Sequence, residues 1–174
     1  YVAYKDYNWM MKTMENLLGD VAKSVHGKAK VILAGKEIDF TPPYARVTMR
    51  DAILEHTSFD IENLDEDGLR GACKTLGIDV DASMGRGKLI DELFGEKCEH
   101  RYIQPTFITD YPVDMSPLTK THRDKPGYTE RFELFINGTE VANAYSELND
   151  PIDQRERFEA QAKLAERGDD EAMF

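Results

Sequence analysis

Residues 131–150 read RFELFINGTEVANAYSELND, and this stretch decides the fold. At its centre stands Asn137-Gly138, a pair that readily adopts the positive φ angles of a two-residue hairpin turn. Strand-forming residues lie on both sides of this pair, over 132–136 and 139–147. The pattern therefore predicts an antiparallel β-hairpin with its tip at Asn137-Gly138.

Further strands and helices are predicted around this hairpin. Residues 105–112 resemble a strand, and residues 30–34 and 37–40 form a second hairpin around Gly35-Lys36. A capping box at Thr48 and Asp51 predicts a short helix over 49–55. Separate hairpins and helices define an α+β protein.

Both ends of the chain are predicted to be helical. The first helix would run from the start of the chain to Gly27, with a buried stripe made of Tyr4, Tyr7, Met11, Met14, Leu18, Val21 and Val25. The last helix would begin at Asp150-Pro151, an N-cap followed by proline at the first helical position, and end at Gly168.

Residues 57–102 differ from the segments around them. An acidic lead-in is followed by two groups of apolar residues at helical spacing, which are Leu69, Ala72, Cys73 and Leu76, and then Leu89, Ile90, Leu93 and Phe94. We predict a small helical insertion here, between a first part of the core, residues 1–56, and a second part, residues 103–174.

The composition excludes several classes of protein. With 41% hydrophobic and 32% charged residues among 174, the chain can build a core and is not disordered. A net charge of −11 provides no cationic surface for a phosphate backbone, so we do not expect this chain alone to bind nucleic acid tightly. Cys73 and Cys98 lack zinc-ligand spacing. Without an apolar run long enough for a bilayer or a signal peptide, the expected location is cytoplasmic, with no membrane partner.

Four segments, in order, resemble class II lysyl-tRNA synthetases. The stretch 131–150 is similar to one of the family's segments, and 104–112 (QPTFITDYP) is similar to the strand before it. Residues 1–7 (YVAYKDY) resemble the helix after the second signature motif, and 168–174 (GDDEAMF) match the residues just ahead of the third. The resemblance covers the whole chain and is looser over the insertion.

The resemblance implies a fold and a reaction. The fold would be an antiparallel sheet flanked by helices, with ATP and the amino acid lying on the sheet. The reaction would join lysine to ATP as lysyl-adenylate, release pyrophosphate and pass the lysyl group to tRNA(Lys). Mg²⁺ would be the cofactor of ATP, and the parent enzyme would be a homodimer. Such chemistry depends mainly on positioning and on neutralisation of charge.

The resemblance also implies that this chain is an internal piece of the catalytic domain. The chain opens at Tyr1 inside a periodic pattern, without an initiator Met. The arginines of the second and third motifs, and the anticodon-binding OB-fold domain, would lie outside the 174 residues. No catalytic set is then complete, and we expect the chain alone to show no lysine-dependent ATP–pyrophosphate exchange.

Two glutamates near the hairpin tip are the candidate metal ligands. By resemblance, Glu133 and Glu140 would hold the Mg²⁺ that accompanies ATP, since this hard cation prefers oxygen ligands shared with nucleotide phosphates. The residues alone would favour two exposed glutamates on a polar sheet face.

Four further residues are the candidate lysine-binding set. Asn143, Tyr145 and Glu147 alternate along the strand, and by resemblance they bind lysine, with Glu147 facing the ε-ammonium. Tyr1 corresponds to a tyrosine that lines the same pocket in the family. The alternation alone would favour Tyr145 as a core residue and Glu147 as a charge at the strand end, and the resemblance reverses this preference.

The two groups can share one active site only if the strand after Gly138 contains a β-bulge. A two-residue loop pairs Phe135 with Glu140 and places both candidate metal ligands on one face. Uninterrupted alternation would then turn the lysine-binding set to the opposite face. We therefore predict an extra, unpaired residue near Val141 or Ala142.

Three alternatives remain beside the tRNA ligase. One is a paralogue that attaches lysine to a protein, and another is an aspartate- or asparagine-specific relative. Glu147 favours a cationic substrate over an anionic one, and an OB-fold domain in the full-length sequence would exclude the paralogue. The third alternative is a non-catalytic acidic interaction module acting through residues 57–102, which failure to form lysyl-adenylate would favour.

Overall fold

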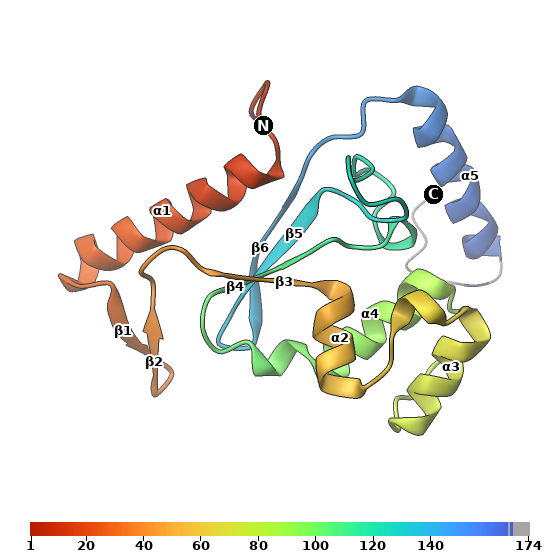
Figure 1. Ribbon diagram of the computed structural model, residues 1–174, viewed down its shortest axis with the longest axis horizontal. Coiled ribbons are helices and arrows are strands. Elements are labelled where there is room, and N and C mark those ends of the chain that lie inside the picture. The colour runs from red at the N-terminus through yellow and green to blue at the C-terminus, as the bar shows by residue number, and fades with distance from the viewer. Residues whose placement is uncertain (167, 169–174) are drawn as a thin grey trace.

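A mixed four-stranded sheet lies at the centre of the computed structural model, which describes residues 1–166 and 168 (Figure 1). The strand order is β3 (Ala45–Thr48), β4 (Thr106–Thr109), β5 (Arg131–Ile136) and β6 (Thr139–Tyr145). The last three strands are antiparallel, which confirms the α+β prediction. β3, which was not predicted, runs parallel to β4 because a long helical crossover connects the two.

The helix α1 (Tyr7–His26) begins later than predicted. Asp6 caps it, with its Oδ1 accepting a hydrogen bond from the Trp9 backbone N–H at 3.0 Å, so the residues before it are not helical. Gly27 ends the helix in the left-handed region, as predicted, with φ of 71°. The segment 169–174, which resembles the residues ahead of the family's third motif, lies outside the described residues.

The buried stripe of α1 is also rotated from the predicted one. Tyr4 lies outside the helix, and Val21 and Val25 are exposed. The buried positions are Tyr7, Met11, Glu15, Gly19 and Ala22. Apolar periodicity could not show this, because a buried carboxylate takes part: the Oε1 of Glu15 accepts from the Tyr44 backbone N–H at 3.0 Å and lies 3.0 Å from Nη2 of Arg46.

The other predicted elements are confirmed with small shifts of their bounds. The hairpin of β1 (Lys30–Leu33) and β2 (Lys36–Asp39) forms a separate two-stranded sheet. The helix α2 (Met49–Thr57) follows Thr48, whose hydroxyl accepts from the Asp51 backbone N–H at 3.0 Å. The predicted strand over 105–112 is shorter, and the last helix is α5 (Pro151–Glu166).

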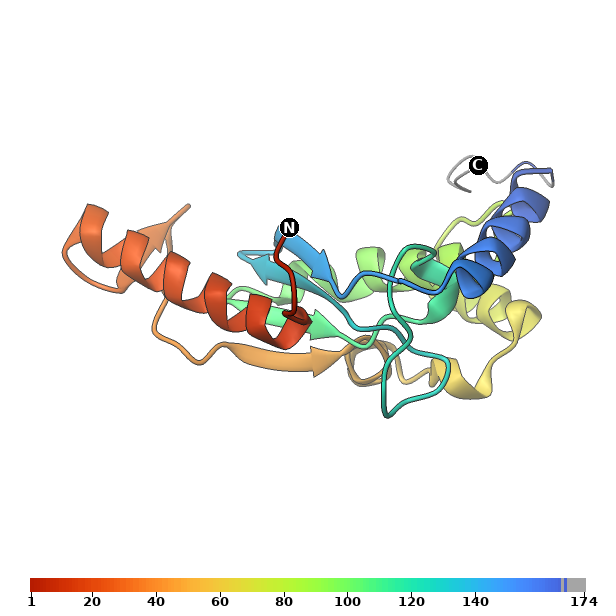
Figure 2. The same cartoon turned by 90° about the horizontal axis from the view of Figure 1, so that it is seen from above.

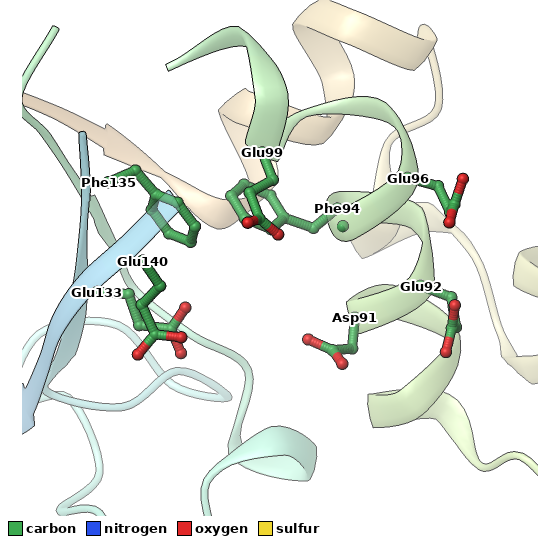
Figure 3. Close-up of a pocket in the computed structure, with 9 residues that line it drawn as sticks. Asp91, Glu92, Phe94, Glu96, Glu99, Glu133, Phe135 and Glu140 are labelled. Carbon is green, nitrogen blue, oxygen red and sulfur yellow. The ribbon is translucent and has the colours of Figure 1, made fainter. Parts of the chain in front are cut away.

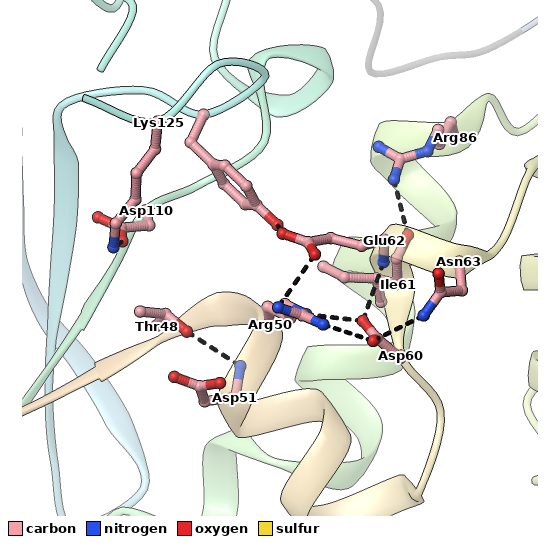
Figure 4. Close-up of polar contacts among 11 residues, drawn as sticks. Thr48, Arg50, Asp51, Asp60, Ile61, Glu62, Asn63, Arg86, Asp110 and Lys125 are labelled. Carbon is pink, nitrogen blue, oxygen red and sulfur yellow. Dashed lines mark hydrogen bonds and ion pairs between the residues drawn. The ribbon is translucent and has the colours of Figure 1, made fainter. Parts of the chain in front are cut away.

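The predicted insertion contains α3 (Glu66–Thr75) and α4 (Arg86–Lys97), with short 3-10 turns η1 (Ile61–Asn63) and η2 (Glu99–Arg101) at its ends. Arg50 on α2 joins the start of the insertion, because its guanidinium donates to both carboxylate oxygens of Asp60 at 2.7 and 2.6 Å (Figure 4). Asp60 in turn caps η1. This ion pair holds the pKa of Asp60 at about 2.

Each face of the sheet packs against its own helical layer (Figures 1 and 2). On β5, Phe132, Leu134 and Ile136 contribute to the core that includes α1 and the β1–β2 hairpin. Phe135 points to the opposite face and joins the core of α2, α3 and α4. The insertion therefore shares a hydrophobic core with the sheet.

Two further observations concern the cysteines and the expectation that no segment crosses a membrane. Cys73 and Cys98 are buried, free thiols in the α2–α4 core, and burial raises the pKa of Cys98 to about 12. Within residues 1–166 and 168, no helix combines the length and apolar character needed to cross a bilayer.

Candidate active site

The predicted bulge is present, and Val141 is its extra residue. Phe135 pairs with Glu140 and the adjacent Leu134 pairs with Ala142, so Val141 has no partner on β5. Beyond the bulge, Glu133 pairs directly with Asn143. The irregularity confirms the prediction and brings the candidate metal ligands and the start of the lysine-binding set onto one face of the sheet.

The hairpin tip is held against the end of the insertion. Asn137 and Gly138 have φ angles of 56° and 72°, as the predicted turn requires. The backbone N–H of Gly138 donates to the Tyr102 carbonyl at 3.0 Å, and a Cβ atom on Gly138 would lie 3.1 Å from Cα of His100. The close approach favours glycine at this position and fixes the hairpin relative to α4 and η2.

The metal end of the site is a small acidic cavity of about 290 Å³ between β5, β6 and α4. Figure 3 shows the carboxylates of Glu133 and Glu140 side by side on the strand wall, with Asp91 across the cavity on α4. Glu92, Glu96 and Glu99 also line it. These carboxylates were not predicted as part of the site, because helical spacing alone does not indicate what the helix faces.

Glu133 is the most constrained of these carboxylates. Its Oε1 accepts from the Arg131 guanidinium at 2.5 Å and from the Asn143 side-chain amide at 3.2 Å. Burial, opposed by Arg131 and assisted by the nearby charge of Glu140, raises the pKa of Glu133. Asn143 thus joins the metal end to the lysine end through a hydrogen bond.

Arg131 is itself oriented by the segment that precedes it. Its Nη1 donates to the Met115 carbonyl and to the Ser116 hydroxyl, each at 3.0 Å. Its guanidinium also lies 4.5 Å from the ring centroid of Tyr111, a cation–π distance. With Nη1 held in this way, Nη2 donates to Glu133, so the arginine acts as a fixed support for that carboxylate.

The donor set at the metal end fits an ion shared with a nucleotide. Within the described part of the chain, no group of three His, Cys, Asp or Glu side chains could hold a metal by itself. Glu133 and Glu140 supply two carboxylates, and phosphate oxygens and water would complete the shell that Mg²⁺ requires.

The lysine end is a larger cavity of about 870 Å³ between the N-terminal segment and the end of β6. All four candidate lysine-binding residues, Tyr1, Asn143, Tyr145 and Glu147, line this cavity. Tyr145 is half-buried, and the other three are exposed. The structure therefore brings together residues from the two ends of the chain.

Three charged residues that line this cavity were not predicted from the sequence to be part of the site. Lys120, Arg123 and Glu130 line it, and Arg123 bridges the buried Glu130 at 2.6 Å to Asp6 at 3.0 Å. Burial opposes ionisation of Glu130, yet hydrogen bonds from Arg123 and Ser146 bring its pKa below the ordinary value. These residues lie in an irregular loop, where no periodic sequence pattern marks them. Their part in the cavity depends on partners that are distant in the sequence.

Fold and site together define a class of protein. The chain belongs to the class II tRNA synthetases: a family model described as "tRNA synthetases class II (D, K and N)" matches residues 1–173. Among curated relatives, the chain is 63% identical to the lysine–tRNA ligase of Porphyromonas gingivalis strain ATCC BAA-308 / W83. It is 62% identical to the lysine–tRNA ligase of Christiangramia forsetii and 55% to that of Azobacteroides pseudotrichonymphae.

The matches confirm the resemblance stated from the sequence and give its extent. In all three alignments the whole chain is covered, over 174 residues. The chain spans 30%, 31% and 35% of the length of these relatives, about a third of each.

Proposed function

We propose that this chain provides the strands of a lysine–tRNA ligase on which lysine and ATP meet. The observation that supports the proposal is the bulge at Val141, since Glu133, Glu140 and Asn143 then lie on the same sheet face, beside an acidic cavity and a larger one. The high identity to lysine–tRNA ligases supports lysine as the amino acid. The full-length enzyme would form lysyl-adenylate and transfer the lysyl group to tRNA(Lys).

The lysine cavity has suitable chemistry at each position. Tyr145 and Tyr1 offer apolar ring surfaces for the methylene stem of lysine, and Asn143 offers an amide for its polar backbone end. Glu147 lies past the end of β6 and supplies a carboxylate for the ε-ammonium. Filling the cavity would remove water from this ion pair and strengthen it.

The metal end has the complementary role. Glu133 and Glu140 would hold Mg²⁺ together with the ATP phosphates, and the ion would supply neutralisation of phosphate charge. Arg131 and Asn143 hold the Glu133 carboxylate in one orientation, so that little reorganisation is needed when the nucleotide binds.

The remaining features of the whole protein are also proposals. The chain would be an internal piece of the catalytic domain, divided into core residues 1–56, a helical insertion over 57–102 and core residues 103–174. The full-length enzyme would be a cytoplasmic homodimer whose tRNA-binding surface lies mostly outside this acidic chain.

The decisive experiment measures ATP–pyrophosphate exchange by the full-length protein with lysine, aspartate or asparagine as the amino acid. We expect exchange with lysine only, followed by charging of tRNA(Lys). Exchange with aspartate or asparagine would assign a different relative, and lysylation of a protein in place of tRNA would assign the paralogue. Absence of exchange with any of the three would favour the interaction module.

At the metal end, Glu133→Gln in the full-length protein is expected to raise the Mg²⁺ and ATP concentrations required for half-maximal exchange. Loss of one charge-stabilising contact of this kind costs about 10²–10³ in rate. The matched control is Glu159→Gln, an exposed carboxylate on α5 that lines neither cavity, which should leave both requirements unchanged. An equal effect of the two substitutions would show that Glu133 is not a ligand of the metal.

A further inference from the structure

Arg157 is a buried arginine on α5, a helix whose other residues are half-buried or exposed. It is 8% exposed and is the buried residue of α5 (Figure 1). Its Nη1 donates to the carbonyls of Ser116 at 3.0 Å and Thr119 at 2.6 Å, and its Nη2 donates to the Thr121 hydroxyl at 2.8 Å. Nε and Nη2 also donate to the two carboxylate oxygens of Asp153 at 2.7 and 2.9 Å. Five bonds use every N–H of the guanidinium.

Arg157 binds segment 116–121. This segment forms a short ladder with residues 146–148, at the end of the lysine cavity. The backbone N–H of Lys120 donates to the Ser146 carbonyl at 2.9 Å, and that of Leu148 donates to the Leu118 carbonyl at 3.1 Å. Between these bonds, Thr119 and Glu147 form an isolated antiparallel bridge. The segment therefore lies directly beside the backbone of the candidate lysine acceptor.

The position of Glu147 depends on this ladder more than on the main sheet. The last named pair between β5 and β6 is Arg131 with Tyr145, so Glu147 lies past the end of that pairing. Its neighbour Ser146 still donates to the Glu130 carbonyl, at 2.9 Å. From Glu147 onward, the partner strand is segment 116–121.

Arg157 holds this partner strand through bonds that a smaller residue cannot replace. Without the guanidinium, the buried carbonyl of Thr119 would lose its donor, and that of Ser116 would keep only the Thr119 backbone N–H at 3.2 Å. A buried polar group without a partner is costly. The segment would then shift to reach water. Asp153, whose pKa Arg157 lowers through their hydrogen bonds, keeps the guanidinium in its plane.

We infer that Arg157 is a positioning residue for the lysine cavity: it fixes segment 116–121, and that segment fixes the backbone of Glu147. That the substrate is lysine rests on the proposed function. The link from Arg157 through segment 116–121 to the backbone of Glu147 does not. A small displacement of a binding group by a distant substitution can cost about 100-fold in rate. The expected signature is weaker use of lysine with unchanged use of ATP.

The first test measures the mechanical link by hydrogen exchange in the full-length protein. In Arg157→Ala, the amides of Lys120 and Leu148 should exchange at least about tenfold faster, because the ladder they belong to opens more often. Amides of the β4–β5 pairing should keep their rates. Arg155→Ala is the matched control, since Arg155 is exposed on the same helix. Unchanged exchange at Lys120 and Leu148 would overturn the inference whatever the protein's substrate is.

The second test measures ATP–pyrophosphate exchange with lysine and ATP titrated separately. Arg157→Ala should raise KM for lysine by about 10–100-fold and leave KM for ATP within about twofold. Arg157→Lys should recover part of the loss, because an ammonium can still donate to the two carbonyls. An equal fall in kcat/KM for both substrates would assign Arg157 a merely structural role and overturn the inference.

The two tests separate failure of this inference from failure of the proposed function. Wild-type protein that gives no lysine-dependent exchange contradicts the function, and the lysine role of Arg157 falls with it. Wild-type protein that uses lysine, with an Arg157→Ala variant that does so at the same KM, contradicts the inference alone.

Discussion

Glu147→Gln in the full-length protein is expected to lower kcat/KM for lysine by a factor on the order of hundreds to thousands. The ε-ammonium loses its water as it enters a cavity lined by Tyr145 and Tyr1, so it requires a charged acceptor there. Removing one partner of a buried charge pair costs roughly 3–5 kcal/mol, and ~1.4 kcal/mol corresponds to tenfold in rate. Glu147 is exposed in the free chain, so the pair becomes buried only when lysine binds.

The measurement is pyrophosphate exchange with lysine and ATP varied in separate series. ATP use should change little, because Glu147 lies past the end of β6, whereas Glu133 and Glu140 lie in the paired part of the hairpin. Glu156→Gln, at an exposed position on α5, controls for the loss of a surface charge and should behave as wild type. A variant that loses ATP use as much as lysine use, or retains both, would show that the role assigned to Glu147 is wrong.

Inserting one alanine between Val141 and Ala142 is expected to abolish activity, whereas deleting Val141 should be tolerated. Deletion leaves Glu140 opposite Phe135 and Ala142 opposite Leu134, so no side chain changes face. Insertion would turn Asn143 and Tyr145 toward the core on the α1 side, where Ala142 and Ala144 now pack. Burying the Asn143 amide there without a partner costs about 1–3 kcal/mol, before the added bulk of Tyr145 is counted.

Thermal unfolding and exchange kinetics of the two full-length variants give the comparison. The deletion should remain within about tenfold of wild-type kcat/KM, because Val141 is half-exposed and its side chain lies outside both cores. The insertion should lower kcat/KM by at least about 10³-fold, since it displaces Asn143, Tyr145 and Glu147, three of the four candidate lysine-binding residues. Equal activity of the two variants would mean that the strand absorbs an extra residue as a wider bulge, and register would then not be what joins the two ends of the site.

Local signals in the sequence predicted those parts of the molecule that depend on neighbouring residues. Asn137-Gly138 determines the tip of the hairpin because few other pairs tolerate two positive φ angles, and Thr48 with Asp51 determines the start of α2. The bulge at Val141 followed from residue counting once the two residue sets were required to share a face. Each of these inferences uses backbone geometry over a few residues, which sequence encodes directly.

Other parts of the fold and the candidate site were decided by contacts between residues far apart in the chain. The buried stripe of α1 includes Glu15 because Tyr44 and Arg46 on the neighbouring segment bind it. The parallel partner of β4 is β3, across the whole helical insertion. No periodic pattern marks such partners, because the sequence around each residue does not indicate which distant residue the fold brings beside it.

The two cavities also combine features that the sequence predicts with features that only the tertiary structure decides. The sequence by itself determined that Glu133, Glu140, Asn143 and Tyr145 lie on adjacent strands, because hairpin pairing is local. Only the tertiary structure decided that α4 faces Glu133 with further carboxylates, that Lys120, Arg123 and Glu130 line the cavity of Glu147, and that Arg157 supports Glu147 through segment 116–121. The physical reason is that closing a long loop costs conformational entropy, which is repaid by the packing and hydrogen bonds of the whole fold together and leaves no signature in a short stretch of sequence.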